Sequence, residues 1–250
     1  MKPFKAALIN EAEKMYRKKK AIVIVVISLV SIILGQLMIL IARKGLGIRG
    51  VSGVSFPLFV LDIFVQTILP LFTILVAIDV FSGEFSRNTM KIAVSAPITR
   101  FKLFSAKVTA VGVFTMINLM VVMILSLLIG IILDFSSLSI EGILQVFISY
   151  VVTIVPVMAL ALTIIFFANI FRSGTAIFFL AILAFLVQKI VELYYSSFSS
   201  ILLTSMLYWH KYWDITSLSP SLLLKEFFLM AGYVIIFFTA GYYLFENKDL

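Results

Sequence analysis

The stretch VTAVGVFTMINLMVVMILSLLIGIIL, residues 108–133, contains no charged side chain. A helix rises about 1.5 Å per residue and the hydrocarbon core of a bilayer is about 30 Å thick, so about 20 apolar residues cross it. This stretch therefore predicts a membrane-spanning helix. Five further apolar runs predict five more spans: residues 21–42, 58–80, 143–170, 175–191 and 227–245.

The composition of the chain places it in the membrane class. Of its 250 residues, 62% are hydrophobic and 13% are charged, whereas soluble domains average about 45–50% and about 25%. Only a bilayer solvates so much apolar surface. We therefore predict an all-α membrane protein with six transmembrane helices and a single domain over residues 1–250. The absence of cysteine excludes disulfides, thiolate metal sites and cysteine nucleophiles.

Lysine and arginine predict the orientation of the spans. With the N-terminus inside, the inner segments 1–20, 81–107, 171–174 and 246–250 hold 14 of these residues and the outer flanks hold six. Positive charge concentrates in cytoplasmic loops, so both termini are expected to be cytoplasmic. The same rule explains the net charge of +8, and nucleic acid is not an expected partner.

Residues 1–20 carry an amphipathic pattern ahead of the first span. Apolar side chains recur there at three- and four-residue spacing, and they are Phe4, Leu8, Ala12, Met15 and Tyr16. The pattern predicts a helix that lies in the membrane interface, with its apolar stripe in the lipid and its basic residues on anionic headgroups. A plain cytoplasmic tail is the alternative.

Residues 192–226 are too apolar and aromatic for an ordinary solvated loop. Residues 196–207 are too few to span a bilayer, and they predict a short helix that dips into the outer leaflet or is buried against the other helices. The aromatic residues that follow are typical of a membrane surface; they are Tyr208, Trp209, Tyr212 and Trp213. Ser219 followed by Pro220 predicts the start of the last helix.

The longest polar interruption is SGEFSRNTMKIAVSAPITRFKLFSAK, residues 82–107. Residues 82–95 are compatible with a helix, with Glu84 in a first turn where the helix dipole favours a carboxylate. Pro97 ends that helix, because a residue before proline is driven from the α region, and it can open the next helix. Two helices and a corner predict a docking surface for a cytoplasmic partner. A loop bound to lipid headgroups is the alternative.

This loop resembles the ABC-2 type permease family, in which an acidic residue, a small polar pair, an apolar helix and P-I-[ST]-R stand between the second and third spans. The matching pieces here are Glu84, Asn88-Thr89, MKIAVSA, Pro97-Ile98-Thr99-Arg100 and Lys107. Family members often carry Gly-Thr where this chain has Asn88-Thr89. The basic N-terminal helix, the six spans and the apolar loop before the last span extend the resemblance to the whole chain.

The resemblance implies the permease subunit of a bacterial ABC exporter in the cell membrane. Two permeases, identical or paralogous, would pair, and each would insert a coupling helix at residues 84–95 into a separate ATPase subunit that holds ATP and magnesium. The coupling residues implied in this way are Glu84, Phe85, Asn88, Thr89, Ile92, Ser95, Pro97 and Arg100. The resemblance to exporters of bacteriocins, toxins and antibiotic peptides favours a hydrophobic or amphipathic peptide as cargo. Export of drugs or lipids is the alternative.

The chain shows no catalytic motif. A phosphate-binding loop, an H-E-x-x-H pair and a G-x-S-x-G turn are all missing, and His210 is the single histidine. We therefore expect no enzyme activity, no metal and no cofactor on this chain, with ATP hydrolysed by the partner. A non-ABC secondary transporter or membrane scaffold is the rival class. A secondary carrier would show broken helices in paired positions, and the sequence shows no such pairing.

Two polar residues inside predicted spans are candidates for the substrate pathway. Asp62 lies near the outer end of the second span, where a position at the membrane surface is the alternative. Asn118 lies deep in the third span, where a hydrogen bond between helices is the alternative. Lys189 and Glu192 are expected to pair across one helical turn. Pro70 and Pro156 are each expected to kink a helix; both lie within apolar runs.

Overall fold

The computed structural model describes residues 2–17, 26, 29–30, 32–35, 37, 53–86, 98–135, 139–171, 173–195, 200–213 and 219–247. Within these residues the chain is helical and contains no strand. The elements are α1 (Lys2–Arg17), α3 (Ser55–Gln66), α4 (Ile68–Ser86), α6 (Arg100–Leu133), α7 (Ile140–Val152), α8 (Ile154–Ile170), α9 (Gly174–Tyr194), α11 (Leu203–Met206), the 3-10 helix η2 (Leu207–Trp213) and α12 (Pro220–Glu246).

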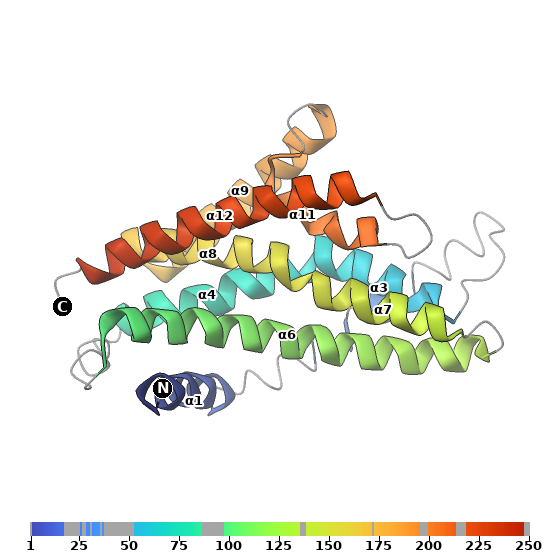
Figure 1. Cartoon of the computed structure of the whole chain (residues 1–250), viewed down its shortest axis with the longest axis horizontal. Helices are drawn as coiled ribbons and strands as arrows, with labels where there is room; N and C mark the ends of the chain where they lie inside the picture. The colour runs from blue at the N-terminus through green and yellow to red at the C-terminus, as the bar shows by residue number, and fades with distance from the viewer. Residues whose placement is uncertain are drawn as a thin grey trace.

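The long helices form an elongated bundle (Figure 1). α6 has 34 residues and runs along the whole bundle for about 50 Å. The α3–α4 and α7–α8 pairs lie beside it, α12 packs along α8, and α1 lies against the first half of α6. We call the end that holds α1, the end of α4 and the start of α6 the basic end. The opposite end, where α6 leads into α7, is the far end.

Five of the six predicted spans correspond to described helices. Four helices are long and apolar enough to cross a membrane: Arg100–Ile132, Ile140–Ile170, Gly174–Tyr194 and Pro220–Glu246. The bent pair Ser55–Gln66 and Ile68–Ser82 makes a fifth span if it crosses as one unit. The first predicted span, residues 21–42, lies mostly outside the described residues. The count of six therefore stays a prediction.

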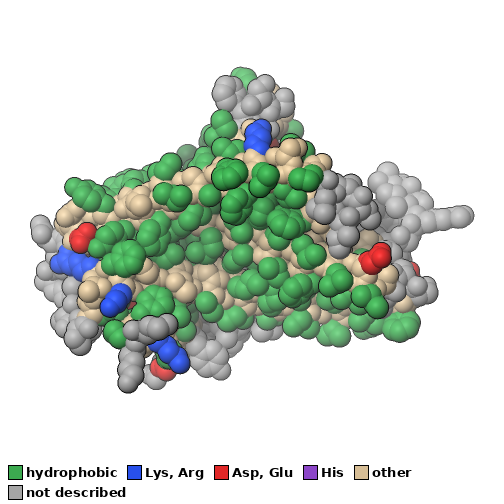
Figure 2. Space-filling view, in the orientation of Figure 1, with side chains coloured by type: hydrophobic (Ala, Val, Ile, Leu, Met, Phe, Trp, Pro, Cys, Tyr) green, Lys and Arg blue, Asp and Glu red, His purple; other side chains and the backbone are tan. Residues whose placement is uncertain are grey.

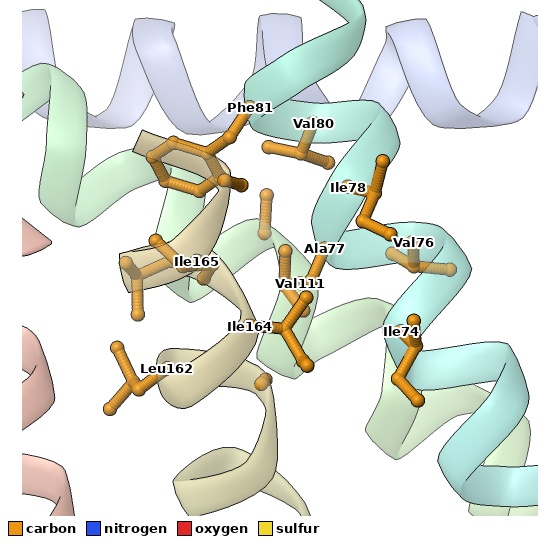
Figure 3. Close-up of a cluster of buried hydrophobic side chains, with 14 of the residues drawn as sticks. Ile74, Val76, Ala77, Ile78, Val80, Phe81, Val111, Leu162, Ile164 and Ile165 are labelled. Carbon is orange, nitrogen blue, oxygen red and sulfur yellow. The ribbon is translucent and has the colours of Figure 1, made fainter. Parts of the chain in front are cut away.

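The core lies where α4, α6 and α8 meet. Figure 3 shows the apolar side chains that α4 contributes, with Val111 from α6 and Ile164 and Ile165 from α8. A second cluster joins α3, α6 and α7 toward the far end, around Phe64. These side chains are removed from lipid as well as from water, so close packing between helices holds the bundle together.

Two breaks interrupt the helices at the same local motif. α3 ends before Thr67 and α4 begins after it, with a bend of 49°, and α7 and α8 are divided at Thr153. Each threonine stands three residues before a proline, Pro70 or Pro156. Proline lacks an N–H and clashes with the carbonyl four residues earlier, which is the residue before the threonine. The expected kink at Pro70 is therefore confirmed, and the helix that holds Pro156 is interrupted one turn before that residue.

The hydroxyl of each threonine also donates a hydrogen bond to a backbone carbonyl one turn earlier. The Thr67 hydroxyl donates to the Ile63 carbonyl at 2.6 Å, and the Thr153 hydroxyl donates to the Ser149 carbonyl at 2.7 Å. Such bonds back to the preceding turn favour a bent helix. α3–α4 and α7–α8 share this motif, but among the described helices only the α3–α4 pair is bent by more than 40°.

The outer surface of the bundle is apolar between its ends. Figure 2 shows hydrophobic side chains over most of this face, with most of the Lys and Arg side chains gathered at the basic end. α9 and α12 are the least covered of the candidate spans, since only 11% of the apolar window of each is buried. These two helices therefore offer the largest apolar surfaces to lipid or to another chain.

Candidate functional site

The basic end holds the two helices that bracket residues 87–97. α4 runs unbroken from the bilayer region through Glu84 and Phe85 to Ser86, and α6 begins at Arg100. The prediction of a separate helix with Glu84 in its first turn is therefore wrong: Glu84 lies in the last turns of α4 as described, and the dipole argument does not apply to it. Five other predicted coupling residues lie outside the described residues, and they are Asn88, Thr89, Ile92, Ser95 and Pro97.

The start of α6 differs in detail from the prediction. Thr99, not Pro97, stands before the first helical residue, and its hydroxyl accepts a hydrogen bond from the Lys102 N–H. A threonine hydroxyl satisfies one of the free donors of a first turn, which fixes where the helix begins. Arg100 donates from its guanidinium to the backbone carbonyl of Glu246. The first residue of α6 is thus joined to the last residue of α12.

Lys107 lies two turns into α6 and its side chain is fully buried. Its ammonium lies 3.2 Å from Oε2 of Glu11 in α1 and donates to the backbone carbonyl of Val80 in α4 at 3.4 Å. It also lies 6.0 Å from the centre of the Phe81 ring. Three helices therefore meet at one buried cation. Sequence reasoning included Lys107 only as part of the family pattern and did not predict its partners.

Glu11 was missed, although the sequence carries a signal for it. It stands between Leu8 and Met15 at helical spacing, so it shares their face. A carboxylate within an apolar stripe needs a buried partner, because burying an unpaired charge is costly. The side chain of Glu11 is only 4% exposed, and its second oxygen accepts from Lys14 at 2.8 Å.

The apolar stripe of α1 faces the protein in part. Met15 is buried in the main core cluster and Leu8 packs against that cluster, whereas Ala12 is exposed. The prediction that this stripe lies in lipid is therefore wrong for Leu8 and Met15. The physical reason is that α6 offers both an apolar surface and the counter-ion for Glu11. The placement of α1 in the membrane interface stays a prediction.

A second polar cluster lies toward the far end, around Asp62 of α3. The two oxygens of its carboxylate contact Nε2 of His210 at 2.8 Å and Nζ of Lys211 at 3.1 Å. The other ring nitrogen of His210, Nδ1, lies 3.1 Å from the Leu207 carbonyl. Both ring nitrogens thus lie within hydrogen-bonding distance of an oxygen atom. The cluster ties η2 to α3.

The cluster continues to α9 through Lys189. Its ammonium contacts Gln66 of α3 and, at 3.3 Å, Glu192 of its own helix, so the expected pairing of Lys189 with Glu192 is confirmed. Lys189 and Lys211 lie 4.8 Å and 5.0 Å from the centre of the Tyr208 ring. Cations attracted to an aromatic face hold that ring in place. Gln66 adjoins the break at Thr67, so this cluster joins the bent span to η2 and α9.

Asn118 occupies a different environment. It is fully buried in α6, and neither its amide oxygen nor its amide nitrogen has a hydrogen-bond partner among the described residues. A hydrogen bond from this side chain to another helix is therefore not found in the described part of the chain. Asp62, by contrast, is 35% exposed and held by two cations. The structure does not bring the two candidate pathway residues into one site.

An apolar cavity of about 630 Å³ lies between the α7–α8 break, η2 and the start of α12. Its lining includes Val151, Val155, Trp209, Trp213, Leu223 and Phe227. The indole N–H groups of both tryptophans are buried and find no acceptor among the described residues. Neither Asp62 nor Asn118 lines this cavity. Of the lining residues, only Trp209 and Trp213 were singled out from the sequence, as aromatic side chains typical of a membrane surface.

Asp62→Asn is expected to lower the free energy of unfolding of the purified chain by about 1 kcal/mol. The amide keeps the shape of the side chain but removes the charge that faces His210 and Lys211, and the partial exposure of the site limits the effect. Thermal unfolding in detergent measures it. Glu141→Gln, in the first turn of α7, is the matched control. Equal melting temperatures for both variants would show that Asp62 does not hold η2.

The described helices define a multi-pass helical membrane protein with a buried ion pair at its basic end and a second polar cluster around Asp62. The family model described as ABC-2 family transporter protein matches residues 7–191. The chain therefore belongs to the ABC-2 family, as its loop sequence predicted. Membership makes it a membrane component of an ABC transporter system, which works with an ATPase partner. Comparison with curated proteins gives no match.

Proposed function

We propose that this chain is the permease subunit of an ABC exporter and that it couples to a separate ATPase through residues 84–100. The observation that carries the proposal is the family match together with the placement of this segment between α4 and α6, at the basic end of the bundle. ATP binding and hydrolysis on the partner would bias the bundle between two states. Family membership disfavours the secondary transporter and the scaffold.

The proposed cargo is a hydrophobic or amphipathic molecule, with a peptide favoured over a drug or lipid. The support for apolar cargo is the cavity beside the α7–α8 break, which has an almost wholly apolar lining. Apolar walls with a few polar groups are typical of ligand cavities. A second permease, identical or paralogous, would complete the transporter, and the sparsely covered faces of α9 and α12 are the surfaces available to it.

If a separate subunit hydrolyses ATP, the purified chain is expected to show no ATPase activity. It carries no phosphate-binding loop, and that loop is the part that holds the phosphates of ATP. Co-expression with an ATPase encoded beside it is expected to give a complex that co-purifies and hydrolyses ATP. The measurement is phosphate release by the chain alone, by the ATPase alone and by the complex. Hydrolysis by the chain alone would contradict the proposal.

The proposed topology places both termini and residues 84–100 in the cytoplasm of a bacterial cell. The chain contains no cysteine, so single cysteines can be introduced without background labelling. Cysteines at Ser137 and Ser199 are expected to react with a membrane-impermeant maleimide added to intact cells, and a cysteine at Ser95 is expected to react only after lysis. Labelling of the Ser95 variant in intact cells would contradict the proposed orientation.

A further inference from the structure

We propose that the buried ion pair between Glu11 and Lys107 is a positioning clamp that makes α1 and the inner ends of α4 and α6 one rigid unit. We call it the Glu11–Lys107 clamp. Its consequence for coupling rests on the proposed function: movement imposed at residues 84–100 would reach α1 only while the ion pair is formed. Its structural part stands on the geometry alone.

The first argument is the degree of burial on both sides of the pair. The Lys107 side chain has no exposed surface and that of Glu11 is 4% exposed. α6 is far longer than a bilayer requires, so a cation two turns from its start lies near the inner membrane surface, where a lysine could instead extend to water. Lys107 is turned into the protein, and the carboxylate of α1 is brought in to meet it.

The second argument is the number of helices that the ammonium joins. It contacts Glu11 in α1 and the Val80 carbonyl in α4, while its own backbone belongs to α6. α4 leads into residues 87–97 and α6 leads out of them. Both helices that flank this segment are therefore joined to α1 through one side chain, and a shift of either helix changes a contact of Lys107.

The third argument is the packing around the cation. Phe81, beside Lys107, makes edge-on contacts with Phe104 of α6 and Phe245 of α12, at centroid distances of 5.5 Å and 6.3 Å. All three rings are fully or almost fully buried. Figure 3 shows Val80 and Phe81 together at one end of the core cluster, next to the α8 ribbon. The side chains around Lys107 are thus closely packed, so a displacement of one helix is transmitted to its neighbours.

The fourth argument is the small apolar contact that α1 makes with the described helices. Met15 is the one side chain of α1 that is both apolar and buried among the described residues of that helix, and Leu8 is half-buried. This is a small apolar contact for sixteen residues. Removing either charge takes away the ion pair that joins α1 to α6, so the pair makes the position of α1 sensitive to a single contact.

Hydrogen exchange on the purified full chain in lipid nanodiscs tests the structural part. Glu11→Gln and Lys107→Met are each expected to raise the exchange rate about tenfold or more in residues 2–17 and also in residues 77–86 and 98–110, because the helices loosen together. The conservative variant Glu11→Asp, which keeps the carboxylate, is expected to retain protection in all three segments. Lys14→Gln, which removes a more exposed contact of Glu11, is the matched control and is expected to change little.

Two outcomes would overturn the clamp. Faster exchange confined to residues 2–17 would mean that the pair only tethers α1, and unchanged exchange in both single variants would mean that the pair holds nothing. This readout needs no ATPase, so it decides the clamp even if the proposed function fails. Failure of the wild-type chain to bind any ATPase would count against the proposed function instead.

The complex with the ATPase tests the coupling part. Glu11→Gln is expected to leave ATPase binding and basal hydrolysis unchanged and to lower cargo exported per ATP hydrolysed by about tenfold, whereas Glu11→Asp, which keeps the carboxylate, is expected to keep the wild-type ratio. A merely structural defect would reduce the amount of complex and would not alter this ratio. An unchanged ratio in Glu11→Gln would overturn the role of the clamp in coupling.

Discussion

Gly130→Ala is expected to lower the free energy of unfolding by about 1–3 kcal/mol. A methyl group at Gly130 in α6 would lie 2.3 Å from the backbone oxygen of Gly53 and 3.5 Å from Cδ of Pro57. A backbone oxygen cannot turn aside as a side chain can, so the start of α3 must move away from α6. Thermal unfolding of the purified chain in detergent measures the loss, at about 2–4 °C per kcal/mol for a chain of this size.

The matched control is Gly232→Ala in the middle of α12. No atom lies within 4 Å of a methyl group placed there, and alanine favours a helix over glycine by about 1 kcal/mol. The two substitutions are chemically identical and are expected to have opposite signs. Equal melting temperatures would show that the close approach of α6 to residue 53 does not contribute to stability.

Glu84→Lys is expected to reduce export by about tenfold or more while the protein reaches the membrane in normal amounts. The spans insert according to their apolar length, and this change adds no charge to a predicted hydrocarbon-spanning run. Reversal of charge on a docking surface, by contrast, places like charges together or removes an attraction, at a cost that readily reaches tenfold in affinity. Co-purification of the ATPase and export by whole cells measure the effect.

The control for this experiment is Glu141→Lys, the same reversal in the first turn of α7 and at the far end of the bundle. It is expected to leave co-purification intact, because it lies outside residues 84–100. A proline at Ile92 provides an independent test of the segment. If Glu84→Lys and Ile92→Pro both leave assembly and export unchanged, residues 84–100 are a linker bound to lipid headgroups.

Much of the fold could be predicted because it depends on local composition. An uninterrupted apolar run identifies a span wherever it lies, and five of the six runs coincide with described helices. Proline acts on the residue four positions earlier, so the breaks near Pro70 and Pro156 could be placed to within a turn. The start of α12 at Pro220 was predicted in the same way. Each of these statements needs only neighbouring residues.

The candidate sites could be predicted only in part. The family pattern predicted the coupling segment, and the helix-dipole argument placed Glu84 in the first turn of a separate helix. α4 continues through Glu84. Asp62 and His210 were each considered alone, as a pathway residue and as a surface residue. Their contact joins positions 148 residues apart, and no periodicity connects them.

The sequence by itself determined the class of the protein, the approximate spans, the helix breaks and the family, since hydropathy, proline chemistry and a motif are all properties of short segments. Only the tertiary structure decided which charges meet. Glu11 and Lys107, and Asp62 and His210, lie in different helices, and Gly130 of α6 meets Gly53 in the turn before α3. These contacts depend on how the helices rotate and approach one another. Burial then gives these contacts their importance, because a charge or a methyl group enclosed by packed helices has no solvent into which it can turn.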